Sequence, residues 1–322
     1  MSYLLGVQRG LTACASPSGR FAVLALDHRQ NLRKELNPDD PDSVTYEQMA
    51  AFKQAVVAAL APVATGTLLD PEIGVAPAIA SDALPAGTGL IVAIEATGYE
   101  GPPTARISRV LPDWSVEQAK RVGASAAKLL VYYHPDAQNE ADQRRLVERI
   151  ARDCRDHELA LFIEPLSFSV DDHPLQAEGR RRVVVETARR LTELGGDVLK
   201  AEFPYDGSVT DHELWREACA ELDEVSSVPW VLLSGGVDDD TFEAQAAIAC
   251  AAGASGVLVG RSVWAPAARL PARDRDSWLT TEGRARLERL VSLADRAGHA
   301  WRDRWLAATS PDVPGEGWYR EY

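Results

Sequence analysis

The sequence has few cysteine and histidine residues, and both kinds are scattered along the chain. Its four cysteines form no CxxC pair, and its six histidines form no HxH or HxxxH pair. Neither a disulfide framework nor a zinc site held by these residues is therefore predicted. We expect no bound metal and a location in the reducing cytoplasm.

Long apolar runs and a surplus of basic charge are also missing. No apolar stretch is long enough to span a bilayer, and no signal peptide is evident at the start. The formal net charge of −14 argues against nucleic acid or an anionic membrane as the partner. No P-loop, GxGxxG or GxSxG motif occurs, and no cofactor is expected. The expected partner is a small molecule.

Eight short apolar runs are present, and helix-length segments separate them. Continuous apolar runs are typical of parallel strands buried on both faces. Eight β-then-α units predict an α/β fold, a (β/α)8 TIM barrel in one domain over residues 1–322. A doubly wound open sheet is the alternative, but polar residues end nearly every run, not only those beside a switch point. The predicted strands cover residues 21–26, 66–69, 89–94, 126–133, 159–163, 197–199, 230–233 and 256–259.

Capping residues mark the starts of two predicted helices. Thr45 with Gln48, and Ser115 with Gln118, have the spacing at which a hydroxyl and an amide satisfy the first turn of a helix. The predicted helices cover residues 46–60, 115–122, 143–157, 180–194, 212–225 and 241–252.

A C-terminal extension follows the eighth strand. Residues 266–322 are expected to form one long helix, 281–305, and a Pro/Gly-rich tail. The extension is predicted to pack on the barrel, although the tail alone offers two possibilities, folding back on the barrel or lying at a subunit contact. Soluble barrels of this size often associate, so a homo-oligomer is compatible with the sequence.

Two lysines lie in apolar strands at the end of the barrel where active sites are found. Active sites of (β/α)8 barrels lie at the C-terminal ends of the strands, and Lys128 and Lys200 occupy such positions. Burial lowers the pKa of an amine, and a second cation lowers it further. Those conditions favour a neutral amine that attacks a ketone carbonyl. The alternative is that both lysines are ion-paired with Asp27 or Glu202.

Carboxylates at the strand ends are candidates for proton transfer and binding. Glu164 is the best candidate for a general acid/base, because a carboxyl in partly apolar surroundings can carry protons near neutrality; alternatively it is a salt-bridged strand end. Asp27 either orients Lys200, binds a substrate hydroxyl or neutralises Lys128. Asp70 is either a substrate contact or a structural strand cap. Arg29 is a further candidate for substrate binding.

Glycine-rich segments follow the seventh and eighth strands. Barrels commonly bind phosphate there, through backbone N–H groups and an adjacent helix N-terminus. An arginine in the second segment adds a bidentate cation. The alternative is two ordinary turns with a surface arginine. The candidate phosphate-binding residues are Ser234, Gly235, Gly236, Gly260 and Arg261.

Several ordered motifs resemble one enzyme family. The segments FAVLALDHR, FIEPL, VLKAEFP, VPWVLLSGGVDDDTF and AGASGVLVGRSVW are similar to those of the tagatose-1,6-bisphosphate aldolase family of class I aldolases, which includes the sulfofructose-phosphate aldolases. The resemblance covers most of the chain. It implies a metal-independent (β/α)8 enzyme that splits a ketose phosphate into dihydroxyacetone phosphate and an aldehyde.

The resemblance also implies roles for single residues. Lys200 matches the Schiff-base lysine of the family and Glu164 its acid/base glutamate. Asp27 and Lys128 match a supporting charged pair, and the two glycine-rich segments match the phosphate-binding loops.

Two positions depart from the family pattern. His28 stands where the family usually has glutamine, and Ala96 stands where the tagatose-bisphosphate enzymes typically have lysine. Recognition of the far end of the substrate is thereby left open.

The expected function is reversible cleavage of a ketose 1-phosphate through a Schiff base. The substrate is expected to resemble tagatose 1,6-bisphosphate or 6-deoxy-6-sulfofructose 1-phosphate. Two alternatives are transaldolase-like transfer through the same lysine and a non-catalytic sugar-phosphate sensor.

Overall fold

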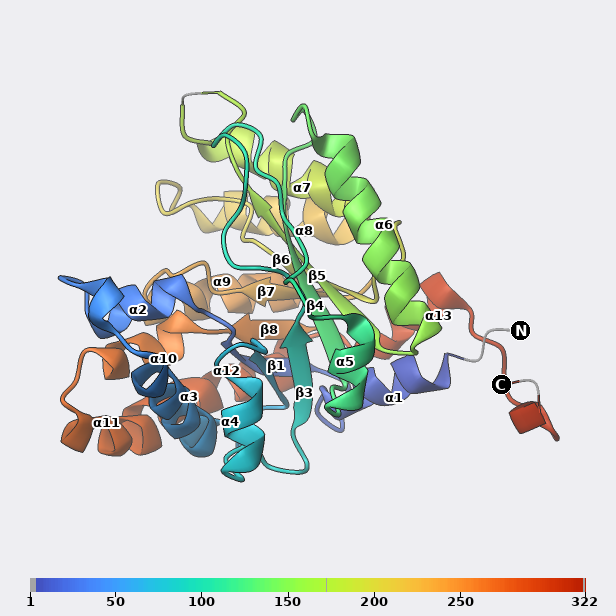
Figure 1. The fold of residues 1–322 in the computed structure, drawn as a ribbon. Helices are drawn as coiled ribbons and strands as arrows, with labels where there is room; N and C mark the ends of the chain where they lie inside the picture. Colours follow the sequence, from blue (N-terminus) through green and yellow to red (C-terminus); the bar gives the residue numbers. More distant parts are fainter. Residues whose placement is uncertain (1–3, 172, 321) are drawn as a thin grey trace.

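The computed structural model describes residues 4–171, 173–320 and 322. Eight parallel strands close into a barrel in sequence order, and β8 pairs with β1 (Figure 1). The predicted (β/α)8 barrel is confirmed, because the pairing of β8 with β1 rules out an open sheet. The strands are β1 (Phe21–Leu26), β2 (Gly66–Leu69), β3 (Gly89–Ala93), β4 (Ala126–Tyr133), β5 (Ala160–Ser167), β6 (Val198–Ala201), β7 (Trp230–Leu233) and β8 (Gly256–Val259).

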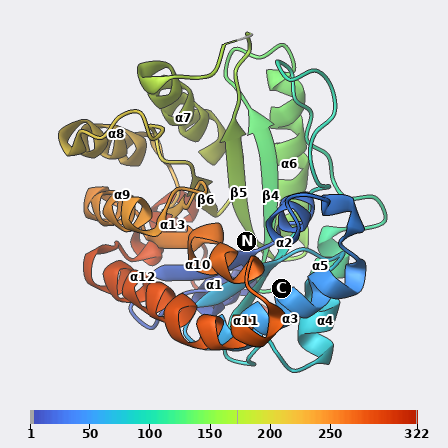
Figure 2. The ribbon, with the colours of Figure 1, turned by 90° about the vertical axis from the view of Figure 1, so that its left-hand side faces the viewer.

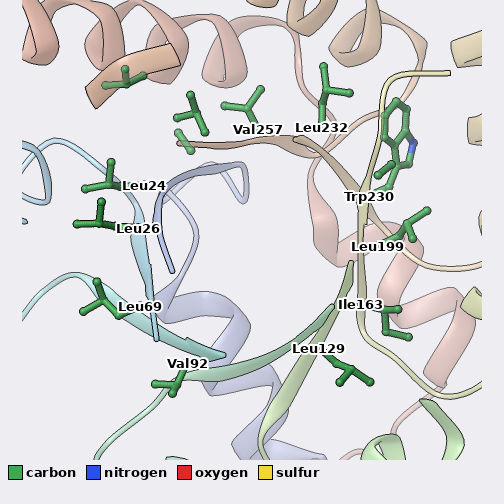
Figure 3. Close-up of a cluster of buried hydrophobic side chains, with 14 of the residues drawn as sticks. Leu24, Leu26, Leu69, Val92, Leu129, Ile163, Leu199, Trp230, Leu232 and Val257 are labelled. Atoms are coloured by element: carbon green, nitrogen blue, oxygen red, sulfur yellow. The ribbon is translucent and has the colours of Figure 1, made fainter. Parts of the chain in front are cut away.

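Six of the eight strands are buried on both faces along their whole length, and β4 and β5 are buried except towards their C-terminal ends. Alternate side chains point outward against the helices, as Figure 3 shows for Leu24, Val92 and Ile163. The intervening side chains, such as Val23 and Phe162, form a second apolar cluster inside the barrel. Successive residues of a strand face opposite sides, so burial on both sides explains why the strands are continuous apolar runs.

The helices between the strands begin where their capping residues predict. The Gln48 amide N–H donates to Thr45 Oγ1 (3.3 Å), and the Thr45 N–H donates to Gln48 Oε1 (2.8 Å). The Gln118 N–H donates to Ser115 Oγ (3.2 Å). The helices are α1 (Leu5–Ala13), α2 (Gln30–Leu36), α3 (Tyr46–Leu60), α4 (Val75–Ala80), α5 (Val116–Arg121), α6 (Glu140–Asp156), α7 (Ala177–Thr192), α8 (His212–Val225), α9 (Asp239–Ala252), α10 (Arg261–Ala268), α11 (Ala272–Trp278), α12 (Arg284–Ala297) and α13 (Trp301–Thr309).

Two strands run further than the sequence predicts. β5 continues to Ser167, and β6 includes Lys200 and Ala201. Glu164 and Lys200 therefore lie within paired strands, on a rigid frame, and not in the loops that follow. Figure 2 shows that β4 and β5 extend beyond the other strands.

The prediction of one long helix over 281–305 is wrong. A π-helical turn (Leu279–Gly283) leads into α12, and the chain then breaks before α13. The break is a bend tied to the barrel: the His299 N–H donates to Ala254 O (2.9 Å), and the Trp301 N–H donates to Gly19 O (3.0 Å). These hydrogen bonds to distant segments outweigh the helical pattern and redirect the chain under the barrel.

Apolar side chains from both ends of the chain close the N-terminal end of the barrel. Leu11 of α1 and Trp301 and Trp305 of α13 belong to the same buried cluster as the inward side chains of the strands. The Trp301 ring lies 6.4 Å from that of Phe21. The opposite end of the barrel carries the polar side chains described below. Within the described residues, no helix is both long and apolar enough to cross a membrane.

Replacing Trp305 should weaken the whole fold. Its side chain is fully buried, and its Nε1 donates to Asp197 Oδ1 (2.9 Å). We expect Trp305→Ala to lower the free energy of unfolding by ~3–5 kcal/mol, because it opens a cavity and removes a donor from a buried carboxyl. Urea denaturation measures this change. Leu306→Ala, at an exposed position of the same helix, is the control, and equal losses in both variants would contradict the expectation.

Candidate active site

Strand alternation gathers five charged side chains above the apolar interior of the barrel. Each follows an inward-facing apolar residue by two positions, as Glu164 follows Phe162 and Lys200 follows Val198. Together they line a cavity of about 510 Å3 at the C-terminal ends of the strands. The five are Asp27, Glu95, Lys128, Glu164 and Lys200.

Lys128 lies at the centre of this group. Its Nζ is 2.7 Å from Asp27 Oδ2, 2.6 Å from Glu95 Oε1 and 2.8 Å from Glu164 Oε2. Burial alone would lower the pKa of Lys128, but Asp27, Glu164 and Glu95 together raise it well above its ordinary value. Burial likewise tends to raise the pKa of Asp27, and the nearby Lys128 and Lys200 instead hold it well below its usual range. Lys128 is therefore a permanent cation that three carboxylates surround.

Lys200 contacts a different partner from those the sequence suggests. Its Nζ lies 2.6 Å from Glu164 Oε1, and its side chain is almost fully buried. Glu202 is engaged elsewhere, because it accepts from Arg180 Nη2 (2.9 Å) and from the Ser167 N–H (2.6 Å). An ion pair with Asp27 or Glu202 is thus absent for Lys200 in the described part of the chain, whereas Lys128 does pair with Asp27. Glu164 bridges the two lysines.

Glu95 is a site residue to which the sequence assigned no role, although it lies at a strand end. Besides its ion pair with Lys128, it accepts from the Leu130 N–H (3.1 Å). Arg29 lies behind it: Nη2 donates to Glu95 O (3.0 Å) and is 3.7 Å from Glu95 Oε1, while Nη1 pairs with Glu72 (2.5 Å). The available signal was its place directly after an apolar run, which Glu95 shares with Asp27 and Glu164. Arg29 also borders the cavity.

Asp70 is a structural strand cap. It is fully buried, it accepts from the Ile73 N–H (2.7 Å), and it forms an ion pair with Lys53 of α3. It does not border the cavity. Of its two predicted roles, the structure favours the strand cap, because α3 supplies a buried cation that pairs with the carboxylate.

The two glycine-rich segments meet beside the cavity. The Gly260 N–H points at Ser234 Oγ (3.5 Å), and α10 begins at the next residue, Arg261. Gly235 and Gly236 have φ of 58° and 85°, a backbone conformation that favours glycine. A Cβ on Gly236 would lie 2.6 Å from Arg261 Nη2, so the guanidinium packs directly on that glycine. All of these except Gly236 line the main cavity; Gly236 lines the adjoining groove.

No group of three or more histidine, cysteine, aspartate or glutamate side chains is placed to hold a metal ion within residues 4–171, 173–320 and 322. Three carboxylates do converge at the centre of the site, but the ammonium of Lys128 lies between them.

Comparison with known proteins places the chain in a family. Residues 21–266 match the DeoC/LacD family aldolase model. The chain belongs to this family of aldolases. It is 29% identical over 321 residues to the tagatose 1,6-diphosphate aldolase of Streptococcus agalactiae serotype V, covering 92% of this chain and 98% of that protein. It is 30% identical over 314 residues to tagatose 1,6-diphosphate aldolase 2 of Streptococcus pyogenes serotype M1, covering 90% and 95%.

Solved structures show the same fold. One is a Schiff base forming fructose-1,6-bisphosphate aldolase, with a TM-score of 0.62, 20% identity and coverage of 89% of this chain and 99% of that one. Another is an archaeal fructose 1,6-bisphosphate aldolase, with a TM-score of 0.60, 22% identity and coverage of 89% and 99%. The aldolase family that the motifs predict is confirmed, and the protein is a lyase.

The structure separates the two positions that depart from the family pattern. In the aldolase, His28 lies on the side of β8, where its ring is edge-on to Trp264 at 5.2 Å. Ala96 follows β3, which is four strands away from β7 in the closed barrel. Both line the cavity, but only Ala96 lies across it from the glycine-rich segments.

The half-buried His28 should make the stability of the aldolase depend on pH. Burial, as the largest cause, lowers the pKa of His28 to about 4. Below about pH 6.5 the unfolded chain binds a proton at His28 that the folded chain does not bind. The free energy of unfolding therefore decreases as the pH falls from about 6.5 towards 4. Between pH 7.5 and pH 4.5 the wild type should lose on the order of 1–3 kcal/mol more than His28→Gln.

Urea denaturation at a series of pH values measures this difference. Above pH 7.5 the two unfolding curves should differ by a constant amount, because His28 is neutral in both states there. Parallel curves over the whole range would show that His28 has no such effect.

Proposed function

We propose that the protein is a class I aldolase in which Lys200 forms a Schiff base with the C2 carbonyl of a ketose 1-phosphate. The observation that carries this proposal is the contact of the buried Lys200 amine with Glu164, 2.6 Å apart, at the floor of the cavity. An amine that attacks a carbonyl must first be neutral, and Glu164 is placed to accept its proton.

The first step of the proposed reaction forms the covalent bond. Neutral Lys200 Nζ attacks C2, and a proton passes from that nitrogen to the former carbonyl oxygen to give a carbinolamine. A proton from Glu164 then converts that hydroxyl into leaving water, which yields the iminium. The iminium is an electron sink, because its nitrogen accepts the electron pair of the breaking carbon–carbon bond.

The second step cleaves the sugar. The Glu164 carboxylate removes the C4 hydroxyl proton, the C3–C4 bond breaks, and the aldehyde leaves an enamine on Lys200. Glu164, or a water that it holds, returns a proton to C3, and hydrolysis of the iminium releases dihydroxyacetone phosphate. Lys128 fixes the second oxygen of Glu164 at 2.8 Å, so the acid/base group is held for each transfer.

The glycine-rich segments supply the proposed binding site for the C1 phosphate. They follow β7 and β8, and β6 with Lys200 is the next strand around the barrel. Phosphate bound by Gly235, Gly260 and Arg261 would therefore place C2 beside the lysine. Binding energy at the phosphate is in this way used to orient the reacting carbon.

The relatives and the sequence motifs suggest three compounds to test as substrates. The streptococcal relatives carry the name tagatose 1,6-diphosphate aldolase, which supports tagatose 1,6-bisphosphate as the first compound. Fructose 1,6-bisphosphate tests the C4 configuration, and 6-deoxy-6-sulfofructose 1-phosphate tests a sulfonate at the far end. Release of free dihydroxyacetone phosphate without an acceptor aldehyde distinguishes an aldolase from a transaldolase.

Borohydride reduction in the presence of substrate should label Lys200. Reduction converts the iminium into a stable amine, so mass spectrometry should find the added mass of dihydroxyacetone phosphate on the peptide that contains Lys200. Lys200→Met should bind substrate, take up no label and show no turnover. A label on Lys128 would contradict the assignment of Lys200. Binding by the wild type with neither label nor turnover would also contradict it and would favour a non-catalytic sensor.

Gly236→Ala should weaken phosphate binding by displacing Arg261. The added Cβ meets the guanidinium at 2.6 Å, and a charge-assisted contact is worth ~1.5–3 kcal/mol. We expect a roughly 10- to 100-fold loss of kcat/KM. Steady-state kinetics measure it against Gly123→Ala, which carries the same kind of backbone strain at a position outside the cavity with open space around its Cβ. Equal losses in the two variants would mean that Arg261 is not involved.

A further inference from the structure

The connection between β3 and α5, residues 94–115, lies along the rim of the barrel that is opposite the glycine-rich segments. Figure 1 shows it rising past the ends of β4 and β5. Its backbone pairs with itself, because the Glu100 and Ile107 amides each donate to the other's carbonyl, at 3.0 and 2.8 Å. Among its side chains is Arg106, to which neither the fold nor the proposed chemistry has given a role.

Buried polar side chains hold Arg106 in place. Asn139 Nδ2 donates to the Arg106 carbonyl (2.6 Å). The next anchor is Ser108, whose N–H donates to Gln143 Oε1 (3.1 Å) and whose Oγ accepts from the Tyr132 N–H (2.7 Å). Asn139, Gln143 and Ser108 are all buried. The loop is therefore docked onto β4 and the start of α6, and Arg106 is presented from a fixed backbone.

The guanidinium of Arg106 lies on aromatic faces and has unused donors. It is 4.6 Å from the ring centroid of Tyr99, and 5.5 Å from those of Tyr132 and Phe168. Its Nε donates to Pro103 O (3.1 Å). Within residues 4–171, 173–320 and 322, neither Nη group has a protein acceptor and no carboxylate pairs with it. Stacking uses the face of a guanidinium and leaves its N–H edge available to a ligand.

Arg109, on the same loop, provides a contrast. Its guanidinium forms an ion pair with Glu100, and the side chains of Arg109 and Glu100 are 57% and 50% exposed. Arg109 is thus neutralised at the surface, whereas Arg106 is held by aromatic rings that cannot neutralise it. A cation that is stacked and positioned but lacks an anion is suited to a ligand that brings one.

Tyr132 connects Arg106 with the cavity. Its side chain lines the cavity together with Lys128, Glu164 and Lys200, and its ring packs beneath Arg106. Burial raises the pKa of Tyr132, so the phenol stays protonated at neutral pH and is a hydrogen-bond donor. Tyr132 borders the cavity on its β4 side, and the guanidinium of Arg106 lies 5.5 Å from the centroid of the Tyr132 ring.

The order of the strands lays out a path for an extended sugar. The proposed phosphate site follows β7 and β8, Lys200 lies on β6, Glu164 on β5 and Tyr132 on β4, and these strands are neighbours in that order. A ketose with its C1 phosphate at one end, C2 at Lys200 and C4 at Glu164 would therefore direct C6 towards Tyr132 and Arg106.

We propose that Arg106, with Tyr132, binds the anionic group at C6 of the substrate, a phosphate or a sulfonate. This inference rests on the proposed function, because the direction of the sugar is set by the Schiff base at Lys200. It makes Arg106 a specificity-determining residue: it selects a ketose that is charged at both ends over one with a neutral C6 hydroxyl.

Binding of uncleavable analogues tests this inference separately from turnover. Isothermal titration calorimetry compares hexitol 1,6-bisphosphate with hexitol 1-phosphate on the full chain. The wild type should bind the bisphosphate more tightly, and Arg106→Gln should reduce that preference ~10- to 100-fold, the range of a charge-assisted hydrogen bond. Arg106→Lys should keep part of the preference, because it retains the charge. Arg109→Gln, the matched control, should keep the preference of the wild type.

The outcomes separate the two proposals. An unchanged preference in Arg106→Gln, or an equal loss in Arg109→Gln, overturns the role of Arg106 even where Lys200 is labelled by borohydride. A lost preference in Arg106→Gln without any label at Lys200 supports the anion site and contradicts the aldolase mechanism. Repeating the titration with 6-deoxy-6-sulfohexitol 1-phosphate identifies the anion: the compound whose binding depends more on Arg106 carries the matching group.

Discussion

The ammonium group of Lys128, enclosed by Asp27, Glu95 and Glu164, is the interaction on which the rest of the site depends. A buried charge is costly unless it is paired and hydrogen-bonded, and here the pairing partners come from three strands, β1, β3 and β5, around β4. Only closure of the barrel brings β1 within reach of β4. The charge cluster can therefore form only in the closed barrel. Removal of the Lys128 ammonium would leave three carboxylates without this counter-charge.

That cluster determines how Glu164 is used. Lys128 engages one oxygen of Glu164 and leaves the other to Lys200, so one carboxylate faces a permanent cation and the amine that exchanges its proton in the proposed reaction. The order of the strands places the proposed phosphate site, the proposed nucleophile, the proposed acid/base group and Tyr132 on neighbouring strands. In the proposed function, an extended substrate therefore lies along these strands in the same order.

The sequence was sufficient for the barrel, because parallel strands buried on both faces leave continuous apolar runs. Five of the eight predicted strand ranges (21–26, 66–69, 126–133, 230–233 and 256–259) agree with the structure at both ends. It also identified Lys200 and Glu164 as residues of one site. It did not identify the partner of Lys200 or the part played by Glu95, because these depend on which carboxylates tertiary packing has already engaged. The role of Asp70 and the break before α13 could not be predicted for the same reason. Asp70 pairs with Lys53, and the break is held by the carbonyls of Gly19 and Ala254, and these partners are distant in the chain.

A crystal structure of the protein soaked with its ketose phosphate and reduced with borohydride would test the proposed mechanism at the reacting atoms. We expect continuous density from Lys200 Nζ to C2, the C1 phosphate against Gly235, Gly260 and Arg261, and Glu164 still held by Lys128. An adduct on another lysine, or a phosphate bound away from the ends of β7 and β8, would contradict it.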